Sequence, residues 1–237
     1  MNKSLDFLGR EAQIDELRSL HARGKHVLIV GPSGIGKTAL VQHVSRYSPL
    51  LICEDASSLC RICDGLEQQL GWQHGDLNVI DRKNRLLAHF EHRDEPVGFD
   101  HVAHPAPRVA RFIAHLIEHV PVWIACRSDQ PNELGHLWQH VYNFTRIEIA
   151  PLSAGETRTL IQAAIAEGNI QADARHDLDE LHRMSGGNPR LLEQLLIELA
   201  TREYKIDSSF GLDLIDLDRR IHEINLAIKA TASDRTK

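Results

Sequence analysis

The segment GPSGIGKT at positions 31–38 constrains the fold of this chain more than any other feature. It matches the pattern G-x-x-x-x-G-K-[ST], follows the β-branched run HVLIV and precedes the helically spaced KTALVQHVSRY. Glycines allow the backbone N–H groups of such a loop to curve around phosphates, and the N-terminus of the next helix adds a partial positive charge. The pattern therefore predicts a buried strand, a phosphate-binding loop and a helix in succession.

The loop and one distant acid supply the candidate site residues. Lys37 can reach the β- and γ-phosphates of a nucleotide, and the Thr38 hydroxyl can bind Mg²⁺. Asp100 directly follows the apolar run PVGF, where its carboxylate can hold Mg²⁺ opposite Thr38. A glycine-rich turn without a ligand and an aspartate that only caps a turn are the alternatives. The predicted phosphate contacts are Gly31, Pro32, Ser33, Gly34, Ile35, Gly36, Lys37 and Thr38.

Strand and helix patterns alternate up to residue 150. Short apolar or β-branched runs predict strands at 26–30, 50–56, 96–99, 120–126 and 146–150, separated by helical patterns. Such alternation favours a parallel sheet covered on both faces. We therefore expect an α/β fold, a P-loop NTPase three-layer sandwich with a five-stranded parallel sheet, followed by a small helical lid.

The pattern changes after residue 150. Helical patterns near 154–167, 174–184 and 189–204 follow one another, and Ser153 with Glu156 resembles the capping pair that begins a helix. A further amphipathic segment covers 216–230. We predict a nucleotide-binding domain at 1–152, a helical lid at 153–230 and a flexible tail at 231–237.

Several motifs in this order resemble AAA+/STAND-type P-loop ATPases, a group that includes origin-recognition, archaeal-ATPase and transposition-helper proteins. The resemblance extends over roughly Phe7–Arg202. FLGREAQIDEL resembles the box that precedes the P-loop in this group, which implies that Gly9 and Arg10 lie beside the adenine. WIACRSD resembles the sensor-1 strand, which implies that Arg127 contacts the γ-phosphate. A surface arginine at a strand end is the alternative for Arg127.

The segment SGGNPRLLEQLL resembles the lid turn and sensor-2 helix of the same group. The resemblance implies that Arg190 points toward the phosphates and that Pro189 lies near the nucleotide; a solvated helix arginine is the alternative. It also implies ATP rather than GTP, and a guanine-reading N/TKxD segment is absent from the sequence. The expected catalytic residues are Lys37, Asp100, Arg127 and Arg190.

Two departures from the group predict slow turnover. His101 stands where the second acid would polarise the attacking water, and a neutral histidine is a different base. The segment HLWQHVYNF contains no arginine, so the expected arginine finger, worth about 10³–10⁵ in rate, is not evident.

Composition narrows the function further. The formal net charge is -6 and no basic run is visible, so charge does not favour nucleic acid as a partner. No apolar run approaches the roughly 20 residues that span a bilayer, and the start lacks a signal-peptide core, so we expect a cytoplasmic protein. Cys60 and Cys63 form a CxxC within a helical pattern, which we interpret as reduced and structural, with metal or redox use as the alternative.

The sequence therefore predicts an ATP-dependent conformational switch with slow ATP hydrolysis. We expect it to act on a protein partner through the lid or the C-terminal helix 216–230. A DNA-linked ATPase of the transposition-helper type and a non-hydrolysing nucleotide-binding scaffold are the alternatives. The oligomeric state is not predicted.

Overall fold

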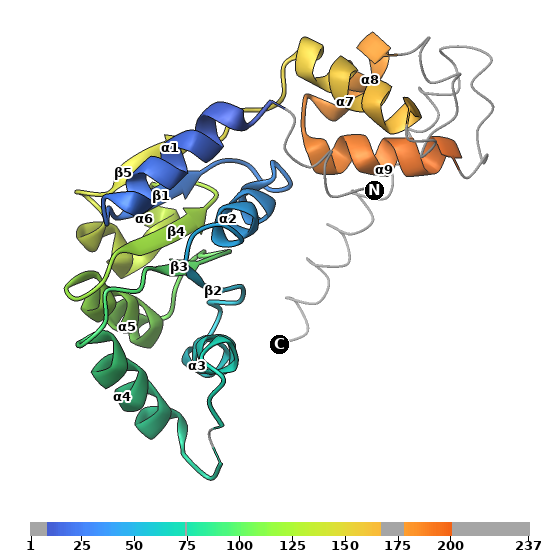
Figure 1. The fold of residues 1–237 in the computed structure, drawn as a ribbon. Helices are drawn as coiled ribbons and strands as arrows, with labels where there is room; N and C mark the ends of the chain where they lie inside the picture. The colour runs from blue at the N-terminus through green and yellow to red at the C-terminus, as the bar shows by residue number, and fades with distance from the viewer. Residues whose placement is uncertain (1–8, 74, 167–177, 201–237) are drawn as a thin grey trace. The chain divides into compact units, whose positions relative to one another are not determined.

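A computed structural model describes residues 9–73, 75–166 and 178–200 (Figure 1). The chain divides into two compact units. The first comprises Arg10–Ala150, and the second comprises Gly9 together with the described residues from Pro151 onward. Each unit is treated by itself below.

The first unit is built on a five-stranded parallel sheet with the strand order β2-β3-β4-β1-β5. The strand β4 lies between β1, which leads into the P-loop, and β3, which ends before Asp100. This confirms the α/β class and the parallel sheet expected from the sequence. The strands are β1 (Val27–Val30), β2 (Leu51–Cys53), β3 (Val97–Phe99), β4 (Val122–Cys126) and β5 (Thr145–Glu148).

Helices flank this sheet. The helix α1 packs with α2, while α3, α4 and α5 pack with one another. The sequence patterns anticipated α2 to α5, but α1 was not predicted, because its segment was interpreted only as a motif. The helices are α1 (Glu11–Ala22), α2 (Lys37–Ser45), α3 (Leu59–Gln69), α4 (Val79–Phe90), α5 (Pro107–Ile117) and α6 (Pro131–Leu134), with a 3₁₀ helix η1 (Gly135–His140). The segment between β4 and β5 is therefore helical as expected, but it consists of this short α6 and η1 pair.

Burial follows the sequence pattern closely. Every residue of β1, β3 and β4 is buried, as expected for central strands covered on both faces. The core around them gathers Phe90, Phe99 and Phe112 from three different elements, and Trp123 is 1% exposed. This packed core fixes the carboxyl ends of the strands, where the candidate site lies.

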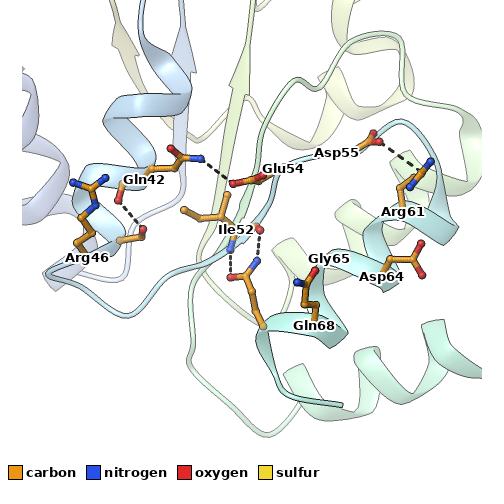
Figure 2. Close-up of a pocket in the computed structure, with 11 residues that line it drawn as sticks. Gln42, Arg46, Ile52, Glu54, Asp55, Arg61, Asp64, Gly65 and Gln68 are labelled. Atoms are coloured by element: carbon orange, nitrogen blue, oxygen red, sulfur yellow. Dashed lines mark hydrogen bonds and ion pairs between the residues drawn. The ribbon is translucent and has the colours of Figure 1, made fainter. Parts of the chain in front are cut away.

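A side chain pairs with the exposed backbone of the edge strand β2. β2 lies at one of the two edges of the sheet, and the Gln69 amide pairs with both backbone groups of Ile52, accepting from its N–H and donating to its carbonyl. Ile52 and Gln69 line a polar groove with a volume of about 630 Å³. Residues that line this groove are drawn in Figure 2. The groove is lined by Gln42 of α2 and by Glu54, which are hydrogen-bonded at 2.8 Å. It contains no residue of the P-loop, so it is separate from the candidate nucleotide site.

A buried ion network joins α3 to α4. Arg82 is 4% exposed and binds Glu67 at 2.7 Å and Asp64 at 2.6 Å. Burial alone would lower the pKa of Arg82, but the hydrogen bonds to Glu67 and Asp64 outweigh it and hold the pKa above its usual value. Arg82 is therefore a charged structural residue of this helix pair.

The second unit contains three described helices: α7 (Ala154–Ala166), α8 (Leu178–Ser185) and α9 (Pro189–Ala200). Ser153 and Glu156 form a reciprocal capping box, since the Ser153 N–H donates to Glu156 at 2.7 Å and Ser153 Oγ accepts from the Glu156 N–H at 3.2 Å. The apolar core of this unit joins Ile161, Leu181 and Leu192, one from each helix. The predicted helix 216–230, the tail 231–237 and the outer part of the predicted helix 189–204 lie outside the described residues.

None of the described helices between residues 9 and 200 is both long enough and apolar enough to cross a bilayer.

Candidate nucleotide-binding site

The P-loop adopts a conformation that its glycines permit. Gly34 and Gly36 have φ angles of 78° and 99°, a region that other residues rarely enter, and Gly36 is the residue from which α2 begins. Gly31 is required for a different reason, because a Cβ there would lie 2.8 Å from the Ile149 carbonyl oxygen. Ile35 is 1% exposed and anchors the loop in the core. The loop therefore presents a turn at the N-terminus of α2, as its sequence predicts.

Lys37 is the buried cation of this loop. It is 8% exposed, and its Nζ donates to the carbonyls of Gly31 at 2.7 Å and Pro32 at 2.9 Å. Burial lowers the pKa of Lys37, while the negative charges of Asp100 and Glu133 act in the opposite direction. The ammonium group is thus held by the loop itself, close to two carboxylates.

Asp100 presents one carboxylate oxygen without a hydrogen-bond partner. The residue is 2% exposed, and its N–H donates to the Cys53 carbonyl at 2.9 Å. Its Oδ1 accepts from the His101 N–H at 2.8 Å. Its Oδ2 is shielded from solvent and has no hydrogen-bond partner within the described part of the chain. A buried carboxylate oxygen that accepts no hydrogen bond fits a cation ligand, since a shielded polar atom without a donor is costly.

His101 lies between Thr38 and Asp100. Its Nε2 is 3.5 Å from Thr38 Oγ1 and 3.6 Å from Asp100 Oδ2. The predicted metal-binding pair is therefore brought together around a single imidazole nitrogen. His101 has a φ of 52°, uncommon for a residue other than glycine, and its side chain is 72% exposed. An exposed side chain in this place can move aside when a cation binds.

Glu133 is a candidate site residue that the sequence interpretation missed. Its side chain is 14% exposed, Oε1 is shielded without a hydrogen-bond partner among the described residues, and Oε2 lies 3.8 Å from His104 Nε2. The His104 N–H also donates to the Glu133 carbonyl at 2.6 Å, which ties the segment after β3 to α6, the short helix after β4. No motif marked Glu133; the signal that could have found it is an acid placed soon after the strand that leads to Arg127.

Arg127 and Arg10 are the other predicted site residues of the first unit. Arg127 is exposed directly after β4, close enough to influence Lys37 by charge. Arg10 is 8% exposed and donates to the Ala150 carbonyl at 2.8 Å. It therefore lies at the carboxyl end of β5, the strand next to the P-loop strand. Arg146 is the arginine nearest in sequence to HLWQHVYNF, the segment that lacks the expected arginine finger. It is paired with Asp129 at 2.9 Å.

In the second unit, the predicted lid motif forms a well-defined turn. Gly186 and Gly187 have φ angles of 57° and 71°, and Asn188 Oδ1 accepts from the Arg190 N–H at 3.1 Å. Pro189 occupies the first position of α9, which suits its missing N–H, and Arg190 is exposed. Gly9 belongs to the same unit, where a Cβ on it would lie 2.6 Å from Glu156 Oε1. The nucleotide roles of Gly9, Pro189 and Arg190 stay predictions.

The cysteines agree with the structural interpretation. All four are free, and Cys53, Cys63 and Cys126 are buried. Burial raises the pKa of Cys53 and of Cys126 to about 12 and that of Cys63 to about 11. Such thiols are poor nucleophiles and poor metal ligands, and only Cys60 is exposed.

Comparisons with solved structures support the fold. The chain is similar to Cdc6p from Pyrobaculum aerophilum, with a TM-score of 0.61 and 14% identity over 85% of this chain and 65% of that one. It is similar to the Aeropyrum pernix ORC1 protein solved with DNA, with a TM-score of 0.64 and 16% identity over 83% and 61%. A STAND protein with a tetratricopeptide repeat sensor from Pyrococcus horikoshii gives a TM-score of 0.52 and 20% identity over 90% and 32%.

The chain thus spans less than two thirds of the length of the Cdc6p and ORC1 chains that it resembles. No curated protein sequence matches it. Residues 6–204 match the family model described as AAA ATPase domain, and this range includes the P-loop, Asp100 and the helical unit. The chain belongs to the AAA ATPase domain family of P-loop nucleotide-binding ATPases.

Proposed function

We propose that this protein binds ATP with Mg²⁺, hydrolyses it slowly and acts as a conformational switch on a protein partner. The observation that carries the proposal is that three functional groups lie beyond the carboxyl ends of the central strands. Lys37 is buried within the P-loop, while Thr38 Oγ1 from the start of α2 and Asp100 Oδ2 from the end of β3 approach the same imidazole nitrogen. These are the groups that a nucleoside triphosphate and its cation require.

Within this proposal, each group has a distinct role. Backbone N–H groups from Gly34 to Thr38 bind the phosphates, and Lys37 exchanges its carbonyl partners for phosphate oxygens. Thr38 and Asp100 hold Mg²⁺, which neutralises charge on the phosphates when it is bound. Arg10 and Gly9 contribute to the adenine side, as the family resemblance implies.

We assign the water-activating role to Glu133 rather than to residue 101. Asp100 and Glu133 are two carboxylates whose charges act on Lys37, and Asp100 is assigned to the cation. Glu133 keeps one oxygen free of hydrogen bonds to the described residues, so it can accept a proton from water. Glu133 lies in the short helix α6 after β4 rather than directly at the end of β3, and this less direct placement supports slow turnover.

The switch is proposed to use two arginines. Arg127 follows β4 in the first unit, and Arg190 lies at the start of α9 in the second. Each is proposed to contact the γ-phosphate, as the family resemblance implies, and hydrolysis or release would end these contacts. In the STAND protein of similar fold, the ATPase accompanies a tetratricopeptide repeat sensor, which supports a protein partner for this chain.

The test is calorimetry of ATP binding with and without Mg²⁺, combined with phosphate release. Wild-type protein should bind Mg-ATP and release phosphate well below about 1 s⁻¹, the low end of typical enzyme turnover. Binding without any hydrolysis would support the scaffold alternative, and no binding would refute the proposal.

A DNA-linked ATPase is the second candidate. It is supported by the similarity to the ORC1 protein, which was solved in complex with DNA. The net charge of -6 argues against it, since phosphate contacts require clustered Lys and Arg. A gel shift at several salt concentrations, with phosphate release measured with and without DNA, distinguishes the two candidates. DNA-stimulated hydrolysis would favour this second function.

A further inference from the structure

Three side chains outside the nucleotide site converge at the ends of α4 and α5. They are Glu91, which caps the C-terminus of α4, His115 from the last turn of α5, and His119, which follows that helix. One ligand atom from each lies within 4.8 Å of the other two. His115 Nε2 is 3.7 Å from Glu91 Oε1, and the two imidazole rings are 4.7 Å apart between centroids.

The backbone explains why the two histidines face the same way. His115 lies in the last turn of α5, and the chain continues this turn beyond the end of the helix, since the N–H groups of His119 and Val120 both donate to the Leu116 carbonyl. Residues four apart on a helical turn share a face. The Glu91 N–H donates to the Leu87 carbonyl, which fixes the end of α4 beside them.

We propose that Glu91, His115 and His119 bind a first-row transition-metal ion, with Zn²⁺ as the best match. Two imidazoles and one carboxylate form a donor set that Zn²⁺ accepts, with the fourth position left to water. Mg²⁺ and Ca²⁺ prefer oxygen ligands and do not suit two nitrogen donors. Such an ion would join the C-terminal ends of α4 and α5.

The distances allow the site to close around an ion. Ligands at 2.0–2.2 Å from a tetrahedral Zn²⁺ lie roughly 3.3–3.5 Å from one another. The Glu91 to His115 distance of 3.7 Å is already close to that value, and no spacing among the three ligand atoms exceeds 4.8 Å, so a contraction of at most about 1.3 Å is needed. Glu91 and His119 are exposed, so their side chains have room to adjust.

His115 provides an observation of a different kind. Its Nε2 is shielded from solvent and has no hydrogen-bond partner among the described residues. A shielded polar atom without a partner is unfavourable, and a metal ion would satisfy it. An ion pair of Glu91 with a protonated His115 is the competing explanation, and it does not require His119.

The experiment is a titration of the metal-free, nucleotide-free full chain with Zn²⁺ by calorimetry at about pH 8, where protons compete less for the imidazoles. The chain has 15 histidines, so the result depends on matched variants. His119→Ala and Glu91→Gln remove one ligand each, whereas His136→Ala removes an exposed histidine from η1. Wild type and His136→Ala should bind one Zn²⁺ tightly. The two ligand variants should lose more than the about 10–100-fold that loss of an outer-shell partner costs.

Cobalt spectroscopy and folding controls complete the test. Co²⁺ bound by two nitrogens and an oxygen should give a visible ligand-field spectrum without a thiolate charge-transfer band. Such a band would assign the metal to the exposed Cys60 and overturn the proposal. Equal Zn²⁺ affinity in wild type, His119→Ala and Glu91→Gln would also overturn it. Circular dichroism of the metal-free proteins checks that the exposed substitutions leave the fold intact.

Discussion

Glu133→Gln tests the assignment of the water-activating carboxylate. The substitution keeps the size and shape of the side chain but removes its charge and its ability to take a proton. The fold of α6 should persist, because Glu133 is held by main-chain bonds: its carbonyl accepts from the His104 N–H at 2.6 Å, and its N–H donates to the Gln130 carbonyl at 3.0 Å. We therefore expect a loss confined to the chemical step.

The size and sign of the effect follow from the geometry. General-base catalysis contributes about 10²–10⁴ in rate, so the substitution should raise the barrier to hydrolysis by roughly 2.7–5.4 kcal/mol. The charge of Glu133 acts on Lys37 and has the same sign as a triphosphate. Its removal should therefore leave ATP affinity unchanged or raise it, rather than lower it.

The assay combines single-turnover phosphate release at saturating ATP with calorimetric measurement of ATP affinity. Asp129→Asn is the matched control, because Asp129 is an acid in the segment between β4 and α6 but is paired with Arg146 at 2.9 Å. A partly exposed pair of this kind contributes about 0–1 kcal/mol to folding. A Glu133→Gln rate within about threefold of wild type, or a parallel loss of ATP affinity, would refute the reasoning, because a general base should contribute far more than that.

Four further outcomes follow from the structure. Lys37→Ala should abolish Mg-ATP binding measured by calorimetry, and unchanged affinity would contradict the P-loop assignment. Asp100→Ala should make ATP affinity insensitive to Mg²⁺, whereas wild type should bind better with it. Arg82→Met should lower the free energy of unfolding in urea by about 1–3 kcal/mol, because it removes the nearest cation from the buried Glu67 carboxylate while Arg85 stays 3.3 Å away. Gly187→Ala should lower the free energy of unfolding of the helical unit in urea by about 1–3 kcal/mol or more. The φ of Gly187 is 71°, and a Cβ there would clash with the Leu152 carbonyl oxygen.

The sheet could be predicted because its strands carry local signals. Continuous apolar runs bounded by turn residues identified β1, β3 and β4, and the P-loop pattern fixed the turn after β1. The strand order could not be derived this way, since the position of β4 between β1 and β3 depends on packing between distant segments. The capping pair Ser153 and Glu156 was predictable because both of its hydrogen bonds are local.

The same difference between local signals and contacts of distant segments applies to the residues of the candidate site. Lys37 and Thr38 belong to one short pattern, and Asp100 follows a recognisable strand. Glu133 has neither advantage, because its charge acts on Lys37 only once the chain has folded and α6 lies beyond the end of β4. The proposed metal ligands His115 and His119 were likewise hidden among scattered histidines, since their partner Glu91 comes from another helix.

One backbone turn after β3 relates the histidine that follows Asp100 to the carboxylate of Glu133. His101 and His104 both have positive φ angles, 52° and 44°, so the chain turns sharply at the end of β3. That turn brings the His104 N–H to the Glu133 carbonyl and so holds α6, the short helix that carries the second acid. Sharp backbone turns of this kind are costly and persist where the surrounding structure requires them. Under the proposed assignment, residue 101 is free to be a histidine, because the acid that it would have supplied comes from α6, the helix after the neighbouring strand β4.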